Sequence, residues 1–282
     1  MRSPGHAPSS EPRERLGLLV FILIAFGVPW ACWFLLAETM AVSAMFNSFA
    51  TYGFTAACSA AGFAAAFAEG GWHGLRKFSA RVVGLRFPLW IWIAALLLPF
   101  LAAILTFVNH PGDLFQGGVP RWTSLVATVS FANLFTGPIA EEFGWRGYLL
   151  GFFARRWRPV TAGLIIAPIW AAWHIPIYYD SVFAHVRSAL GFLVWITAWS
   201  VVLALVVTRA RGSVLPSMLA HWSMNAQPAI FFALLPTLAG EKQPGGIAYP
   251  LASAAVAIVV YIAWRGAKWP ADESGARMQP TI

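Results

Sequence analysis

Long apolar segments alternate with short polar segments along the chain. Each apolar segment is about 20 residues long, which at a helical rise of 1.5 Å per residue matches the ~30 Å hydrocarbon core of a bilayer. The segments are continuously apolar and do not alternate with period two, so they predict helices rather than the strands of a barrel. Eight membrane-spanning helices are expected, at roughly 16–37, 42–66, 88–108, 124–153, 159–180, 188–208, 213–235 and 248–264.

The composition agrees with lipid as the main solvent. Of 282 residues, 59% are hydrophobic and only 11% are charged, which excludes an ordinary soluble domain. The first apolar run is too long for a signal-peptide core and lacks a clear cleavage site, so a retained span is expected. The chain is therefore predicted to be an all-α integral membrane protein, with one polytopic domain at 13–268 and disordered tails at 1–12 and 269–282.

The positive charges predict the orientation. Eight spans with a cytoplasmic amino terminus place the tails and the polar stretch from Gly70 to Phe87 inside. Of the 19 lysines and arginines, only Arg121, Arg187 and Lys242 then lie outside, and Arg146 lies within a span. The net charge of +8 thus reflects topology and attraction to lipid headgroups, and nucleic acid is not an expected partner.

The two cysteines are expected to be small buried residues of the membrane domain. Cys32 and Cys58 lie in apolar segments with no acid or histidine beside them in the sequence. This setting is typical of packing rather than of a disulfide or a nucleophile.

Ionisable side chains inside the predicted spans are the candidates for a functional site, because each costs at least ~2.5 kcal/mol in hydrocarbon. One amide accompanies them. The set consists of Glu141, Glu142, Arg146, His174, His221 and Asn225.

Helical spacing predicts which of these residues lie on the same face of a helix. Glu142 and Arg146 are four residues apart and can form an internal ion pair, which leaves Glu141 on a different face as the reactive carboxylate. His221 and Asn225 share a face for the same reason. Trp170 precedes His174 by four residues, so its ring is expected to restrict the imidazole.

Depth in the bilayer allows the three helices to form one site. Counted from the basic residues at the span ends, Glu141 and Asn225 lie about 21 Å inside, His174 about 24 Å and His221 about 15 Å. Prolines in these segments can kink the helices where the backbone lines a cavity.

Three motifs in this region resemble those of the CAAX prenyl endoprotease and bacteriocin-processing (CPBP, or ABI) family of membrane proteins. The run from Glu141 to Arg146 resembles the E-E-x-x-x-R motif of that family. The segment ending at His174 resembles F-x-x-x-H with Trp170 in place of phenylalanine, and the segment from His221 to Asn225 resembles H-x-x-x-N. The motif core covers about 124–230, and order and spacing fit throughout.

The resemblance implies peptide hydrolysis inside the membrane, and the residue types suit that chemistry. Glu141, with His174, would deprotonate water, while His221 and Asn225 would face the developing oxyanion. Glu142 would support the site through its ion pair, and a direct role for it stays open.

Metal dependence is left open by the sequence. Relatives have commonly been labelled metalloproteases, and Glu141, His174 and His221 would supply a zinc set of two imidazoles and one carboxylate. There is no H-E-x-x-H, and zinc would take His221 from the oxyanion, so a glutamate-activated water without a cofactor is favoured.

Two other functions fit the same polar cluster. The cluster could serve only helix association, or it could line the path of an ion- or proton-coupled transporter or channel. If the chain is a peptidase, the resemblance implies a membrane-associated substrate, either a prenylated protein that loses three residues after the modified cysteine or a bacteriocin precursor.

Overall fold

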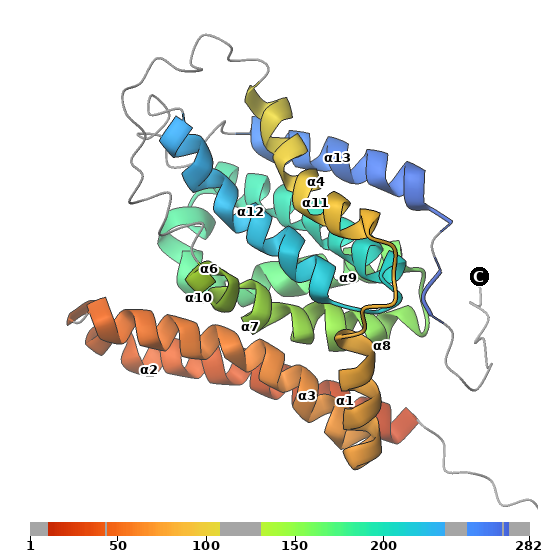
Figure 1. Cartoon of the computed structure of the whole chain (residues 1–282). Helices are drawn as coiled ribbons and strands as arrows, with labels where there is room; N and C mark the ends of the chain where they lie inside the picture. Colours follow the sequence, from red (N-terminus) through yellow and green to blue (C-terminus); the bar gives the residue numbers. More distant parts are fainter. Residues whose placement is uncertain (1–10, 43, 108–130, 235–246, 267, 271–282) are drawn as a thin grey trace, which may run out of the picture.

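The structure is a computed structural model, and it describes residues 11–42, 44–107, 131–234, 247–266 and 268–270. Within these ranges every regular element is a helix, which confirms the predicted all-α class. The helices form two parts, a layer of long amino-terminal helices and a bundle that contains the motif segments (Figure 1).

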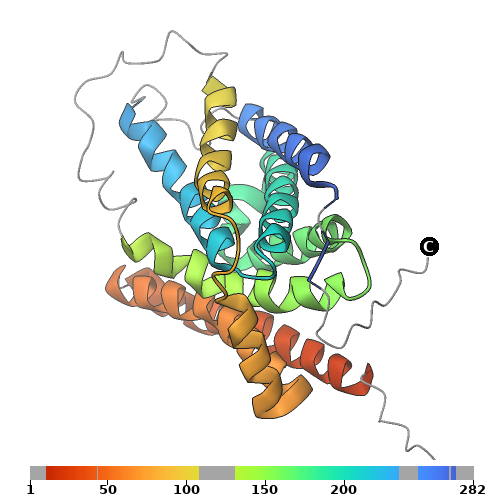
Figure 2. The same ribbon diagram turned by 45° about the vertical axis from the view of Figure 1, so that its right-hand side comes forward.

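The amino-terminal layer consists of two long helical runs that lie side by side (Figures 1 and 2). The first comprises α1 (Glu11–Ile22), the short π-helical segment η1 (Leu23–Gly27) and α2 (Val28–Val42). It begins inside the tail predicted for 1–12.

The second run is α3 (Ala44–Val82), which kinks at Gly71. Gly71 has φ of 57°, a left-handed conformation that glycine adopts without the cost of a Cβ atom. The helix resumes after the kink and continues to Val82. The polar stretch from Gly70 to Phe87 is therefore largely helical and is not a simple connecting loop between two spans.

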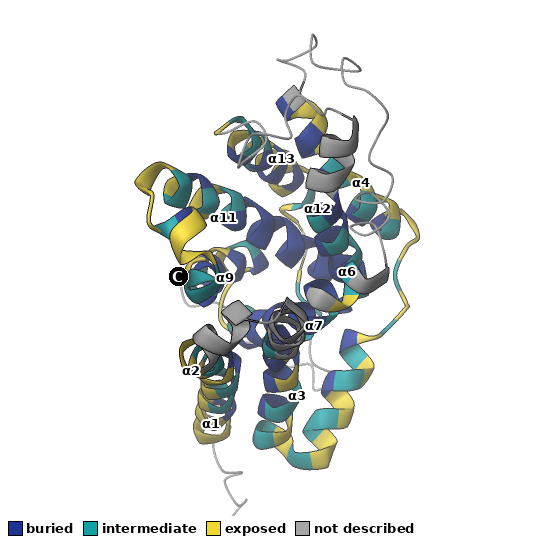
Figure 3. Cartoon of the chain, turned by 90° about the vertical axis from the view of Figure 1, so that its left-hand side faces the viewer, coloured by how far each residue is buried: buried dark blue, intermediate teal, exposed yellow. Residues whose placement is uncertain are grey.

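The bundle is arranged around α11 (Val186–Arg209). Nearly every residue in its second half is buried, and α9 (Pro159–Trp173) and α13 (Ala248–Trp264) pack against it. On the other side, α12 (Leu215–Leu234) packs against α4 (Trp90–Phe107). Buried surfaces of these helices face one another (Figure 3).

Two of the predicted continuous spans are broken. In place of 124–153, the described part has four short elements: α6 (Phe131–Thr136), α7 (Pro138–Glu142), the π-helical η3 (Phe143–Leu149) and α8 (Leu150–Ala154). The break at Gly137 precedes a proline, which lacks a backbone N–H and is suited to the first position of a helix.

The second break follows Trp173. The predicted helix 159–180 ends there, and the next segment, which comprises α10 (Ile175–Tyr178) and η4 (Tyr179–Phe183), turns away by 56°. Pro176 explains this end, because its ring clashes with the carbonyl four residues earlier.

Apolar helices of the described residues support an integral membrane protein. Glu11–Leu35 and Val186–Arg209 are each long and apolar enough to cross a bilayer, and the bent pair makes a third span if its halves count as one. Trp90–Thr106 and Ala248–Trp264 are shorter apolar helices. The number of eight spans and the cytoplasmic position of both termini stay predictions.

Candidate active site

The three motif segments meet at one buried site. Glu141 and Glu142 end α7, His174 follows the last residue of α9, and His221 lies in α12. Both carboxylates and His221 are at most 5% exposed.

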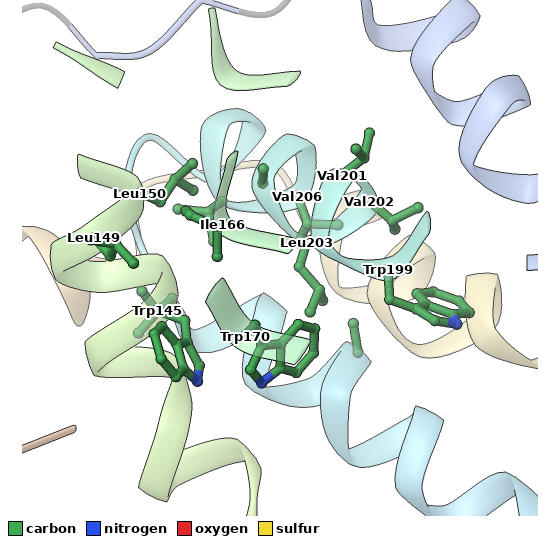
Figure 4. Close-up of a cluster of buried hydrophobic side chains, with 14 of the residues drawn as sticks. Trp145, Leu149, Leu150, Ile166, Trp170, Trp199, Val201, Val202, Leu203 and Val206 are labelled. Atoms are coloured by element: carbon green, nitrogen blue, oxygen red, sulfur yellow. The ribbon is translucent and has the colours of Figure 1, made fainter. Parts of the chain in front are cut away.

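One oxygen of Glu141 is held by two tryptophans. Its Oε2 accepts hydrogen bonds from the indole nitrogens of Trp170, at 2.8 Å, and of Trp145, at 3.3 Å. Figure 4 shows both indole nitrogens pointing to the same side of the buried cluster. Two N–H donors fix the orientation of this carboxylate, and one of them, Trp170, comes from another helix.

The backbone around Glu141 rests on α3. Ser59 Oγ donates to the carbonyl of Ile139 at 2.7 Å, and Cys58 Sγ lies 3.6 Å from the carbonyl of Glu141. Gly144 makes this approach possible, since a Cβ there would lie 2.5 Å from Cys58 Sγ. Cys58 is thus a buried packing residue.

Glu142 joins two of the motifs. Its Oε1 lies 3.0 Å from Arg146 Nη1, which confirms the predicted internal ion pair, and 2.9 Å from His221 Nδ1. The guanidinium of Arg146 also lies over the ring of Trp170, 4.0 Å from the ring centroid. Glu142 therefore orients His221 in addition to pairing with Arg146.

His174 is oriented by the turn before it. Its Nδ1 lies 2.8 Å from the carbonyl oxygen of Trp170, and its ring stacks on Tyr178 at 5.4 Å with an interplanar angle of 5°. The predicted influence of Trp170 is thus present as a backbone hydrogen bond and a tilted ring contact at 5.8 Å. Trp170 also contacts the ring of His221 at 5.7 Å, so it lies between the two imidazoles.

Three polar atoms converge beside Gly137. A Cβ placed on this glycine would lie 2.8 Å from Asn225 Nδ2, 3.4 Å from His221 Nε2 and 3.7 Å from Glu141 Oε1. Glycine at this position allows a carboxylate, an imidazole and an amide to approach the backbone more closely than a side chain would permit. The predicted shared face of His221 and Asn225 is confirmed by this convergence.

The run of α7, η3 and α8, which carries Glu141 and Glu142, is called the motif helix. Its other end is anchored by charge. Tyr148 donates a hydrogen bond of 2.6 Å to Glu69 of α3, and Arg155 lies 2.9 Å from Glu69 and 3.1 Å from Glu14. Arg156 pairs with Glu14 at 2.6 Å. This network ties α1 and α3 to the segment that carries the paired glutamates.

An aromatic pocket lies next to His174. It is lined by side chains from the α2, α3, α9 and α10 segments, with few polar atoms among them. The lining residues are Pro29, Trp30, Trp33, Phe54, Thr55, Trp173, Pro176 and Ile177.

Sequence reasoning missed the two indole donors and Gly137. A usable signal was present for Trp145, since a buried tryptophan usually needs an acceptor for its N–H and Glu141 lies four residues before it. The role of Gly137 depends on α12, and no local pattern indicates it.

The candidate zinc set does not form a three-ligand group. Among the described residues, no three His, Cys, Asp or Glu side chains gather as metal ligands would. The Nδ1 atoms of both imidazoles are engaged, by Trp170 and by Glu142. Among the described residues, Glu141, His174 and His221 thus do not fit a three-ligand zinc site.

The family match to known proteins covers the region that contains the three motifs. Residues 121–227 match the model of the family described as type II CAAX prenyl endopeptidase Rce1-like. The predicted resemblance is confirmed. The matched range contains every catalytic and supporting residue proposed above, from Glu141 to Asn225.

A curated relative agrees with the family match. The chain is 25% identical over 163 residues to CAAX prenyl protease 2 of Methanococcus maripaludis. The similar region covers 53% of this chain and 58% of that protein, so the chain spans little more than half the length of its relative.

Proposed function

We propose that this protein is an intramembrane endopeptidase that hydrolyses a peptide bond in a membrane-associated, prenylated substrate. The convergence of Glu141, His221 and Asn225 beside Gly137 supports the proposal most directly. A base and two potential oxyanion donors gathered at one point are the groups that hydrolysis needs.

Glu141 is the proposed base. Its Oε2 is occupied by two indole N–H groups, so Oε1, on the side of Gly137, is the oxygen that takes the proton from water. The water oxygen then bonds to the scissile carbonyl carbon, and the C–N bond breaks as the proton passes to the leaving amine. His174 assists in orienting the water.

His221 and Asn225 are the proposed oxyanion donors. Because His221 Nδ1 faces the Glu142 carboxylate, the neutral ring would carry its proton there and leave Nε2 without one. Donation from Nε2 therefore requires the imidazolium. With Glu141 and Glu142 negative and Arg146 positive, a protonated His221 makes the cluster neutral, and the cluster carries one net positive charge once Glu141 has taken the proton from water, which favours an oxyanion.

A lipidated substrate is favoured by the apolar surroundings of the site. Aromatic and proline side chains beside His174 offer an apolar surface to its lipid group, and the relative from Methanococcus maripaludis is named as a CAAX prenyl protease. The proposed cleavage removes the residues that follow a prenylated cysteine.

A direct test uses purified protein and a pair of peptides that differ only in the prenyl group. We expect mass spectrometry to detect loss of the three residues after the cysteine in the prenylated peptide. Cleavage of the unprenylated peptide at an equal rate would contradict the lipid requirement. Cleavage of neither peptide, combined with pH-coupled ion flux in vesicles, would favour the transporter.

The proposed reaction uses no metal. Metal analysis of active protein should find far less than one zinc per chain, and a chelator should leave the rate unchanged. Stoichiometric zinc, with activity that is lost on chelation and restored by zinc, would overturn this part of the proposal.

A further inference from the structure

Arg81 connects the end of α3 to the motif helix. It lies in the last turn of α3, and its Nη2 donates a hydrogen bond of 2.9 Å to the carbonyl oxygen of Gly147. Gly147 follows Arg146 directly, inside the π-helical segment η3. Arg81 is thus outside the three motifs yet bonded to the backbone of one of them.

The bonded carbonyl lies where the helix changes its hydrogen-bond pattern. The amide of Leu150 donates to the carbonyl of Trp145, five residues back, and the α-helical pattern resumes in α8. Where backbone hydrogen bonds that span five residues give way to bonds that span four, one carbonyl oxygen of the helix receives no amide donor from within the helix. A buried carbonyl oxygen needs another partner. Arg81 supplies a donor from another helix at this point.

The π-helical segment affects where the glutamates point. Relative to a regular α-helix, a π-helical segment accommodates an extra residue, and one residue corresponds to about 100° around the helix. The segment begins directly after Glu142, and its far end is anchored by Tyr148, inside it, and by Arg155, which follows α8. Relaxation of η3 to an α-helix would therefore turn Glu142 away from His221.

The same end of α3 also holds the start of α12. The carbonyl of Val82 accepts hydrogen bonds from the amide of Val214, at 2.9 Å, and from Ser213 Oγ, at 3.3 Å. α12 begins at Leu215 and carries His221. The last turn of α3 is therefore a common attachment for both helices whose side chains meet at Glu142 and His221.

Glycines make room for the Arg81 side chain. A Cβ on Gly151 would lie 3.3 Å from Arg81 Nη2, and one on Gly212 would lie 2.9 Å from Arg81 Cγ. Gly212 also has φ of 87°, which a residue with a side chain rarely adopts. Trp269 covers the guanidinium with its ring centroid 5.5 Å from Cζ. Three segments far apart in sequence, at Gly151, Gly212 and Trp269, thus fit around this one arginine.

From these contacts we infer that Arg81 is a positioning residue of the active site, which maintains the π-helical register of η3 and thereby directs Glu142 to His221. Its effect on catalysis rests on the proposed function, whereas its effect on the backbone does not.

The test compares Arg81→Met, Arg81→Lys and the control Arg86→Met, because Arg86 is exposed on the following connection. Hydrogen exchange is followed in 143–154 and, as a reference, in α11, together with kcat and KM on a prenylated peptide. In Arg81→Met we expect faster exchange in 143–154 alone and a loss of kcat of about 100-fold with little change in KM. Arg81→Lys should recover part of both, and Arg86→Met should match the parent.

Unchanged exchange in 143–154 with parental kcat would overturn the inference. Faster exchange throughout the chain, α11 included, or failure of both Arg81 variants to fold, would assign Arg81 to general stability and also overturn it. If the parent cleaves no peptide, the proposed function fails, while the exchange measurement still decides the role of Arg81.

Discussion

Arg146→Ala is the substitution whose effect on stability can be worked out most fully. Arg146 is 1% exposed, pairs with the fully buried Glu142 at 3.0 Å and lies 4.0 Å from the centroid of the Trp170 ring. Alanine removes the cation from both contacts. Among the described residues, Glu142 Oε1 then keeps only His221 as a polar partner.

The expected loss is large. Removing one member of a buried ion pair costs about 3 to 5 kcal/mol, because the remaining charge is left uncompensated. The pair is incompletely satisfied at the start, since Glu142 Oε2 and Arg146 Nη2 have no hydrogen-bond partner among the described residues. The lower end, about 3 kcal/mol, is therefore expected, and at 2 to 4 °C per kcal/mol it lowers the melting temperature by about 6 to 12 °C.

Cys58 provides the assay. It is a free cysteine, completely buried beside the Glu141 carbonyl, so in a Cys32→Ala background a thiol-reactive dye will label the protein only as this region opens on heating. Arg86→Ala is the matched control. Because Arg86 is exposed, this variant should have the melting temperature of the parent.

A double variant separates charge from packing. Adding Glu142→Gln to Arg146→Ala removes the uncompensated carboxylate but leaves an acceptor for His221, so the double variant should melt above the single one. A single variant within about 2 °C of the parent would refute the buried-pair argument. A double variant no more stable than the single one would assign the loss to packing alone.

Two further predictions concern rate. Gly137→Ala places a Cβ 2.8 Å from Asn225 Nδ2 and should lower kcat about 100-fold. The control Gly27→Ala, whose Cβ would meet no atom within 4 Å, should behave as the parent, and a parental kcat in Gly137→Ala would contradict the convergence of polar groups at Gly137. Trp170→Phe removes the indole N–H that donates to Glu141 at 2.8 Å and should lower kcat about tenfold in steady-state assays. Phenylalanine is usual at this position of the motif that the chain resembles. An unchanged rate would show that this hydrogen bond is dispensable.

The helical class and the composition of the site follow from short-range patterns. Continuous apolar runs predict helices because lipid cannot satisfy backbone polar groups, and the four-residue spacing of Glu142 and Arg146 predicts their ion pair. Ionisable side chains are costly in lipid, so those inside the predicted spans were chosen as site candidates. The structure brings Glu141, Glu142 and His221 of that set together.

The breaks in the helices and the supporting contacts depend on tertiary partners. The π-helical η3 is accompanied by a donor from Arg81, which lies 66 residues from the carbonyl it contacts, and such a pairing leaves no periodic signal. The hydrogen bond from Trp170 to Glu141 likewise spans 29 residues. A hydropathy pattern also cannot distinguish one straight span from two bent halves, as the segment around Trp173 shows.

The most direct test of the proposed mechanism is the single-turnover cleavage of a prenylated peptide by Glu141→Gln. Glutamine retains an oxygen to accept the indole hydrogen bonds of Trp170 and Trp145, so the variant should fold and bind the peptide as the parent does. It cannot take a proton from water, and the rate should fall by about 100 to 10,000-fold. Cleavage at the parental rate by folded Glu141→Gln protein would contradict the assignment of Glu141 as the base.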